Sequence, residues 1–345
     1  MNRTSKTTLR RATIVDVARL AGVSPATVSN TLSGKRRVEV ATRERIEQAI
    51  RELGYRPNTA AQNIRTGRTN LIAVVSSMPT TISGGGARLG FLMEVASSAA
   101  AFALEHDLAL VLVPSAARPE QVLAHVAVDG ALVIEPRQDD VFIAAFRARS
   151  VPVVCIGQSF DPALPHVELD YHRIAHLLIH HLIGQGARRF PLIIGAEQRM
   201  SYTVMREVFE QVAAERGMTP HVIRVEEARG EDGGYQAIHQ AMRLDPSLDA
   251  VLVPVDTFAT GVMSGLRELG KRVPDDVMVA TRYDGWRAKM EKPALTAIDL
   301  RLEEIADIAT RRLAALISGA SNPLSSKQAP PIRLIPRAST KSGEF

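Results

Sequence analysis

Apolar residues near the N-terminus recur three or four positions apart in three short segments, and this spacing predicts three helices. The first runs over 14–21, the second opens at Pro25, and the third runs from about Ala41 to Leu53. The positions expected on the buried faces are Ile14, Val17, Ala18 and Ala21; Val28 and Leu32; and Ile46, Ala49, Ile50 and Leu53. These positions predict one small helical core.

Residues at the expected helix ends support this prediction. Thr13 followed by Asp16 is typical of a capping box, and Gly22 can end the first helix with a positive φ. Ser24 can cap the second helix, and Pro25 suits its first position. Helix, glycine turn, helix and a third supporting helix is the helix-turn-helix plan, in which the second helix enters the major groove of DNA. A small helical module of another kind is the alternative.

The remaining chain alternates apolar runs with amphipathic stretches such as 88–106 and 258–269. The apolar runs are LIAVVSS, LALVLVP, GALVIEP, VPVVCIG, FPLIIGA, HVIRV, DAVLVPV and VMVATRY. Strands separated by helices indicate parallel sheets covered on both faces. Eight or more strands over about 260 residues predict two sheets rather than one.

The net charge of +5 is distributed unevenly along the chain. Residues 1–68 hold 14 Lys or Arg against 5 Asp or Glu, whereas the rest holds 28 against 32. A basic head on a mildly acidic body is typical of a chain whose head binds a polyanion. No run approaches the length of a membrane span, and the cationic N-terminus lacks the apolar segment of a secretory signal. With Cys155 as the single cysteine, expected to be buried and inert, we expect a cytoplasmic, nucleoid-associated protein.

The motifs DVARLAGVSPATVS, TRERIEQAIRELGYRPN and AAQNIRTGRTNLIAVV closely resemble the head of the LacI/GalR family of bacterial transcriptional regulators. In the body, VDGALVIEP, VPVVCIG, RYDG and PALTAIDLRLEEIADIATRRL resemble the same family, and PRAST matches its last crossing strand. The resemblance implies an all-α helix-turn-helix head and an α/β periplasmic-binding-protein-like body, with two parallel-sheet subdomains and a cleft between them.

The resemblance also implies domain bounds. The helix-turn-helix domain spans 1–57, ordered from about 12, and a hinge helix with its linker spans 58–68. The effector-binding and dimerisation domain spans 69–345. Its N-subdomain covers about 70–168 and 300–325, and its C-subdomain about 169–299 and 326–340.

For DNA, the resemblance assigns contacts to the head and to the hinge helix, which in the family pairs with its partner in the minor groove. The implied DNA-binding residues are Thr13, Ser24, Pro25, Ala26, Thr27, Ser29, Asn30, Ser33, Arg37, Asn58, Ala61 and Ile64. Lys35, Arg36 and Arg37 would lie near phosphates. Asn30 stands where many members have arginine, so the familiar operator sequence is not expected. Ile64 stands where the family inserts a leucine between base steps.

For the effector, the resemblance implies a site in the cleft at the carboxyl ends of strands. The implied residues are Ser76, Asp170, Tyr202, Arg206, Asp256 and Asp284. Two departures remove polar groups that typically hold a sugar ring: Val255 replaces an asparagine, and Met205 stands in place of an arginine that is displaced to Arg206. The effector is therefore a sugar or another metabolite, less hydroxylated or more apolar than usual, or there is none.

Other signals carry no catalytic function. GLRELGKR lacks the Ser or Thr of a phosphate-binding loop, and GGGARLG misses the dinucleotide-binding spacing. His172, His176 and His180 share one helix face, but a solvated stripe is favoured over a metal site. We expect no enzyme, cofactor or metal. The prediction is a repressor that binds a palindromic DNA operator as a homodimer, under control of a small-molecule effector. The rival is a small-molecule-binding protein or enzyme with an incidental basic head.

Overall fold

The computed structural model describes residues 12–33, 38–55, 67–83, 90–114, 118–319 and 329–340. Contacts between Cα atoms divide the chain into two compact units, Met1–Thr69 and Asn70–Phe345. We call them the head and the body and describe each by itself.

The head contains the three expected helices, α1 (Ile14–Ala21), α2 (Pro25–Ser33) and α3 (Val40–Leu53). Its core consists of Val17, Ala18, Ala21, Val28, Ile46 and Ala49. Gly22 ends α1 with φ 66°, as predicted. The prediction that Leu32 is buried is wrong, because this side chain is 37% exposed. Leu32 lies one turn beyond Val28, the α2 residue in this core, and Leu53 at the end of α3 is also exposed, against the prediction.

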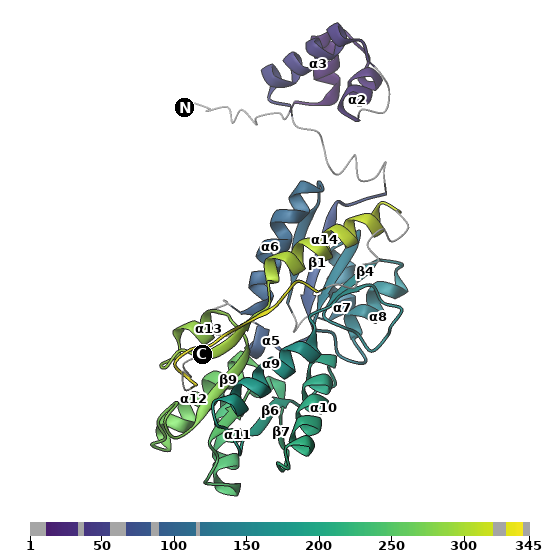
Figure 1. Ribbon diagram of the computed structural model, residues 1–345. Coiled ribbons are helices and arrows are strands. Elements are labelled where there is room, and N and C mark those ends of the chain that lie inside the picture. Colours follow the sequence, from purple (N-terminus) through teal and green to yellow (C-terminus); the bar gives the residue numbers. More distant parts are fainter. Residues whose placement is uncertain are drawn as a thin grey trace, which may run out of the picture. The chain divides into compact units, whose positions relative to one another are not determined.

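The first part of the body is a parallel five-stranded sheet in the order β2-β1-β3-β4-β5 (Figure 1). The strands are β1 (Leu71–Ser76), β2 (Ala109–Val113), β3 (Gly130–Ile134), β4 (Val153–Ile156) and β5 (His166–Val167). Its helices are α5 (Thr80–Ser83), α6 (Phe91–Glu105), α7 (Pro119–His125), α8 (Val141–Ala148) and α14 (Leu302–Ile317). Alternate residues of each strand pack on opposite faces: Ile72 and Val74 belong to the cluster under α6 and α14, and Ala73 and Val75 to the cluster under α8.

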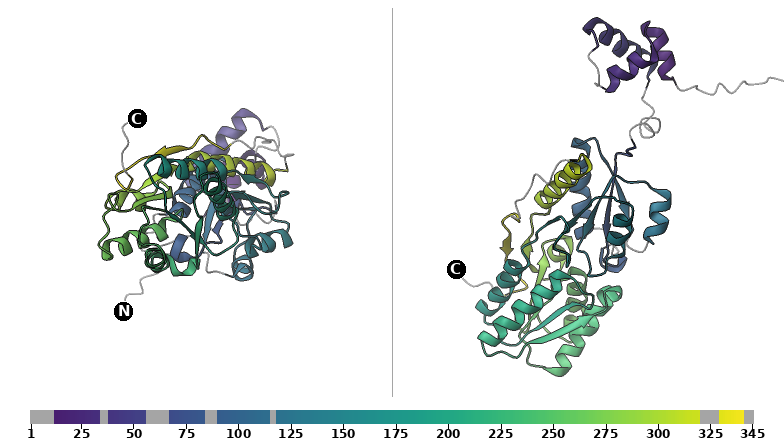
Figure 2. Two further views of the ribbon diagram at one scale, coloured as in Figure 1. Left: turned by 60° about the horizontal axis from the view of Figure 1, so that its bottom comes forward. Right: turned by 90° about the vertical axis from the view of Figure 1, so that its right-hand side faces the viewer.

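The second part is a six-stranded sheet in the order β11-β10-β9-β8-β6-β7, in which only the β10–β11 pair is antiparallel. The strands are β6 (Pro191–Gly195), β7 (His221–Val225), β8 (Ala250–Leu252), β9 (Met278–Tyr283), β10 (Thr296–Asp299) and β11 (Arg333–Ile335). The helices are α9 (Tyr171–Gly184), α10 (Met200–Glu215), the 3-10 turn η1 (Glu227–Arg229), α11 (Gly230–Leu244), α12 (Asp256–Glu268) and α13 (Trp286–Met290). The right-hand view of Figure 2 shows the two sheets in separate halves of the body.

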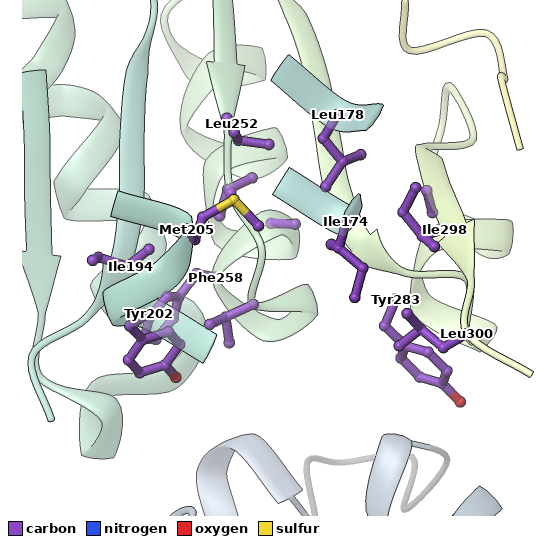
Figure 3. Packing of buried hydrophobic residues seen from close by; sticks show 14 of the residues in the cluster. Ile174, Leu178, Ile194, Tyr202, Met205, Leu252, Phe258, Tyr283, Ile298 and Leu300 are labelled. Carbon is purple, nitrogen blue, oxygen red and sulfur yellow. The ribbon is translucent and has the colours of Figure 1, made fainter. Parts of the chain in front are cut away.

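Helices cover both faces of this second sheet. On one face, α9 and α10 pack together, and Figure 3 shows Ile174 and Leu178 of α9 close to Leu252 and Ile298 of the strands. On the other face, α11 and α12 pack against each other at glycines. A Cβ atom at Gly261 would lie 1.9 Å from the Glu231 carbonyl oxygen, so the two helices approach more closely than a side chain at this position allows.

The predicted fold class is confirmed, and each of the eight apolar runs contains a strand. The eight predicted runs leave out β10 and the two-residue β5, and the sequence prediction misplaced the last strand. PRAST, residues 336–340, follows β11 instead of forming it, since Pro336 cannot donate to a ladder. Ser339 and Thr340 instead hydrogen-bond to Val279 and Thr296. Among the described residues, no helix is both long and apolar enough to cross a membrane.

Candidate nucleic-acid interface and effector cleft

The start of α2 presents the residues predicted to read DNA. Ser24 Oγ accepts a hydrogen bond from Thr27 N at 3.2 Å, which caps the helix, and Pro25 follows as its first residue. Pro25 and Ala26 are exposed, and Thr27, Ser29 and Asn30 are half-buried, whereas Val28 alone turns into the core. The exposed face therefore carries small and polar side chains that a major groove can accommodate.

Thr13 has a structural role that the sequence also predicted. Its hydroxyl lies 2.7 Å from Asp16 Oδ2, and its backbone N donates to the same oxygen at 2.9 Å. In return, Asp16 N donates to Thr13 Oγ1 at 3.4 Å, and these reciprocal bonds between backbone and side chain form a capping box for α1. Thr13 remains exposed, so the capping role leaves its outer side accessible. The predicted contacts Arg37, Asn58, Ala61 and Ile64, together with the side chain of Ser33, lie outside the described residues.

A buried ionic cluster fills the cleft of the body. Arg199, the residue before α10, donates through Nε and Nη2 to the two carboxylate oxygens of Glu227, each at 2.7 Å. Both side chains are 1% exposed. Tyr202 OH donates to the same carboxylate at 2.9 Å. Burial disfavours the charged guanidinium, but the hydrogen bonds and charge of Glu227 raise the pKa of Arg199 above its usual value.

A second ion pair lies beside this cluster. Arg282 on β9 donates through Nη1 to Glu135 Oε1 at 2.8 Å, and Glu135 follows β3 in the other sheet. The guanidinium carbon of Arg282 also lies 5.7 Å from the ring centroid of Phe91, within range of a cation–π interaction. Phe91 in turn meets Tyr283 edge to face at 5.5 Å. The cleft is therefore lined from both sheets by charged and aromatic side chains.

The open space that remains in the cleft is small. A cavity of about 30 Å³ lies among Ser76, Asp256, Arg282 and Tyr283, which is room for one or two water molecules. Burial raises the pKa of the Asp256 carboxyl above its ordinary value, and Arg287 opposes this shift. Asp256 Oδ1 accepts from Thr257 N at 2.8 Å.

The structure brings together only some of the predicted effector residues. Ser76 and Asp256 line the cavity, and Tyr202 binds Glu227 in the adjoining cluster. Asp170 instead caps α9, where its side chain accepts from Arg173 N at 3.2 Å.

Two further predicted effector residues are held in other ion pairs. Arg206 pairs with Glu210 at 2.8 Å, and Asp284 pairs with Arg337 at 2.5 Å and with Lys289 at 3.6 Å. Neither residue lines the cavity.

Sequence reasoning missed the four charges that dominate the cleft: Glu135, Arg199, Glu227 and Arg282. Two of them left a signal. Glu135 ends the apolar run GALVIEP, and Arg282 interrupts VMVATRY, a run that is buried along its whole length. Burying a charge without a partner is costly, so Glu135 predicts a cation nearby and Arg282 predicts an anion nearby. Arg199 and Glu227 lie in polar segments and left no such signal.

The exposure predicted for two residue types outside the cleft, the histidines of α9 and the single cysteine, is confirmed. His172, His176 and His180 are exposed, with the rings of His176 and His180 stacked at 5.6 Å. The described part of the chain holds no group of three or more His, Cys, Asp or Glu that could bind a metal ion. Cys155 is fully buried, and burial raises the pKa of its thiol to about 12, which favours the protonated thiol over the thiolate at neutral pH.

Comparisons with known proteins match both units. The model of "Bacterial regulatory proteins, lacI family" matches residues 13–58, and that of "Periplasmic binding protein-like domain" matches residues 179–340. The HTH-type transcriptional regulator CelR of Thermobifida fusca is 28% identical over 330 residues, covering 90% of this chain and 93% of CelR. Catabolite control protein A of Priestia megaterium is 26% identical over 313 residues, covering 87% and 91%.

Solved structures agree with these matches. The CelR–cellobiose complex aligns with a TM-score of 0.68 at 26% identity, covering 95% of this chain and all of that one (100%). The Lac repressor dimer bound to operator and the anti-inducer ONPF aligns with a TM-score of 0.78 at 23% identity, covering 96% and 100%. The second match shows a shared fold.

Proposed function

Because the chain belongs to the LacI family of bacterial regulatory proteins and is a DNA-binding transcriptional regulator, we propose that it represses transcription by binding a near-palindromic operator as a homodimer. A small-molecule effector in the cleft of the body modulates this binding. The regulator works in the cytoplasm, where the DNA is. The proposed domains are a helix-turn-helix head up to residue 57, a hinge over 58–68, and an effector-binding body from residue 69.

The observation that carries this proposal is the geometry of α2. Its first turn is capped by Ser24 and exposes Pro25 and Ala26, and Asn30 lies one turn further on. A helix that enters the major groove contacts bases through its N-terminal residues. Proline and alanine offer methyl and methylene groups instead of hydrogen bonds, so we expect contacts with thymine methyls and the shape of the groove to contribute to specificity.

Dimerisation has two supports. One short recognition helix reads few bases, and a two-fold pair doubles the contact with a palindromic site. The body also exposes large apolar side chains on α6 and α13: Leu104 is 69% exposed, and Trp286 and Met290 are 51% and 54% exposed. Exposed apolar side chains favour burial against another protein surface, and we propose that a second copy covers them.

The effector site is proposed in the cleft, on Ser76, Tyr202 and Asp256, with Arg282 as an added cation. Arg206, Asp170 and Asp284 reach the ligand only if their present contacts rearrange. A CelR structure that is 26% identical to this chain is a complex with cellobiose, which supports a small polar metabolite as the class of effector. The control is a linkage: an effector that favours one arrangement of the two sheets shifts the equilibrium between DNA-binding and DNA-releasing states.

The test is a selection of genomic fragments by the purified full chain at moderate salt, followed by sequencing of the retained DNA. The proposal predicts recovery of one near-palindromic motif, and loss of that motif in the double variant Ala26→Ser/Asn30→Ala. Gln48→Ala, on the exposed side of α3, is the matched control and should retain the motif. Even retention of all fragments, or of none, would contradict sequence-specific binding.

A further inference from the structure

The cleft of the body is bridged by contacts that need no small molecule. Ser77 follows β1 and Glu135 follows β3, both in the five-stranded sheet. Arg199 precedes α10 and Glu227 follows β7, both in the six-stranded part. The side chain of Arg199 joins these two groups, so the bridge connects the two halves of the body.

Every N–H of the Arg199 guanidinium has a protein acceptor. Nε and Nη2 bind the Glu227 carboxylate at 2.7 Å each, as described above. Nη1 donates to Ser77 Oγ at 3.1 Å and to the Glu135 carbonyl oxygen, and Nη2 also donates to the Ser77 carbonyl oxygen at 3.2 Å. A guanidinium has five N–H donors, and all five are used here. A ligand entering the cleft therefore finds no donor on Arg199 until one of these bonds breaks.

Further polar contacts cross the cleft beside this residue. Gln138 N donates to the Gln198 carbonyl oxygen at 2.9 Å, and Thr81 Oγ1 donates to the Glu227 carbonyl oxygen at 3.2 Å. The Arg282–Glu135 ion pair adds a second charged link between the sheets. The contacts of Arg199, Gln138 and Thr81 together are called the clasp below.

We propose that Arg199 acts as an internal ligand: it holds the cleft closed without a small molecule and so determines what the cleft admits. A molecule the size of a sugar cannot enter a space of about 30 Å³, so it binds only after the contacts of Arg199 with Ser77 and Glu135 open. The inference rests on the proposed function only in taking this cleft as the effector site.

The consequence is that the effector competes with the clasp. In a regulator whose cleft is open without ligand, binding shifts the equilibrium toward the closed arrangement. Here the cleft is already closed by the protein, so the ligand must first displace a protein group. Breaking the clasp costs free energy, so a large neutral effector binds more weakly than its own contacts with the cleft would predict. Loosening the clasp should uncover the site.

The experiment measures amide hydrogen exchange on the full chain, without added ligand or DNA. The reporter is the backbone N–H of Gln138, whose acceptor lies across the cleft. The folding control is the backbone N–H of Ala131, which donates to Pro152 O within the sheet at 2.9 Å. The test variant is Arg199→Met/Glu227→Gln, which removes both charges of the buried pair together. The matched control is Arg272→Met/Asp276→Asn, which removes an ion pair of exposed Arg272 and half-buried Asp276 in the same half of the body.

The proposal predicts slow exchange of Gln138 in the wild type and in the control. In Arg199→Met/Glu227→Gln, it predicts exchange about tenfold faster or more, with Ala131 still protected. Equal protection of Gln138 in this variant, or an unprotected Gln138 in the wild type, would overturn it.

A milder variant covers the case in which the double variant also loses protection at Ala131. Ser77→Ala removes one acceptor and no charge, and should raise exchange of Gln138 by about threefold. No change in Ser77→Ala would overturn the proposal in that case. Hydrogen exchange is measured without DNA, so it does not depend on DNA binding. Failure of the proposed function in the genomic selection can therefore be distinguished from failure of the proposal for Arg199.

Discussion

Arg199 and Glu227 form a two-point ion pair at 2.7 Å, with both side chains almost entirely out of water. The pair lies in the cleft between two sheets, at the position where an effector is proposed to bind. Burial of two charges is costly unless every hydrogen-bonding atom finds a partner, and here Ser77, Tyr202 and Glu135 supply the remaining contacts. The cleft of this regulator is thus an ordered polar interior rather than an empty pocket.

The first prediction concerns the stability of this pair. Arg199→Met alone leaves the Glu227 carboxylate buried without a counter-charge, so it should lower the free energy of unfolding of the body by about 3 to 5 kcal/mol. Adding Glu227→Gln removes the stranded charge and should restore most of the loss. Urea denaturation followed by circular dichroism measures both. A single variant as stable as the double variant would show that the two charges are not coupled.

A second prediction concerns pH. His181 Nε2 lies 2.9 Å from Thr340 Oγ1 in a buried position, and burial lowers the pKa of this imidazole below its usual value of 6.5. As the pH falls below 6.5, the unfolded chain takes up a proton at this residue before the folded chain does, so the free energy of unfolding decreases. His181→Gln should lack this part of the decrease.

The measurement is a series of denaturation curves between pH 7.5 and pH 5. His176→Gln, which alters an exposed imidazole on the same helix, is the control and should follow the wild type. An identical pH dependence in His181→Gln and the wild type would contradict the assignment.

The third prediction concerns the contact of α11 with α12. Gly261→Ala places a methyl group 1.9 Å from the Glu231 carbonyl oxygen and 2.7 Å from Tyr235 N. Both neighbours are backbone atoms, so the helices must separate, and we expect a loss of about 1 to 3 kcal/mol. Gly184→Ala is the matched control, since nothing lies within 4 Å of its Cβ position. Gly261→Ala should lower the melting temperature, whereas Gly184→Ala should raise it or change it much less. Equal melting temperatures of the two variants would argue against close packing between α11 and α12.

The fourth prediction tests the proposed dimer surface. Leu104→Glu/Trp286→Glu introduces charges on α6 and α13 and should shift the protein from dimer to monomer in sedimentation equilibrium. Leu244→Glu, at the end of α11, alters a side chain of similar exposure, 63%, and should leave the dimer intact. Dissociation in the Leu244 variant alone would place the interface on another face.

The sequence predicted the parts of this molecule that depend on local pattern. Helical spacing, Thr13, Gly22 and Ser24 located α1 and the start of α2, and apolar runs located eight strands. It failed where distant segments meet. Arg199 and Glu135 are separated by 64 positions and meet only through the pairing of two halves of the body, which no local pattern encodes. Asp284, predicted to bind effector, is held by Arg337, which is also remote along the chain.

The most direct test of the central claim is a titration of labelled DNA by the full chain, followed by fluorescence anisotropy. The selected near-palindrome is compared with a shuffled sequence of the same composition at the same physiological salt. The account predicts that the wild type prefers the selected sequence by about 1,000-fold or more, and that Ala26→Ser/Asn30→Ala loses most of this preference. Equal affinity of the wild type for the two sequences would contradict it.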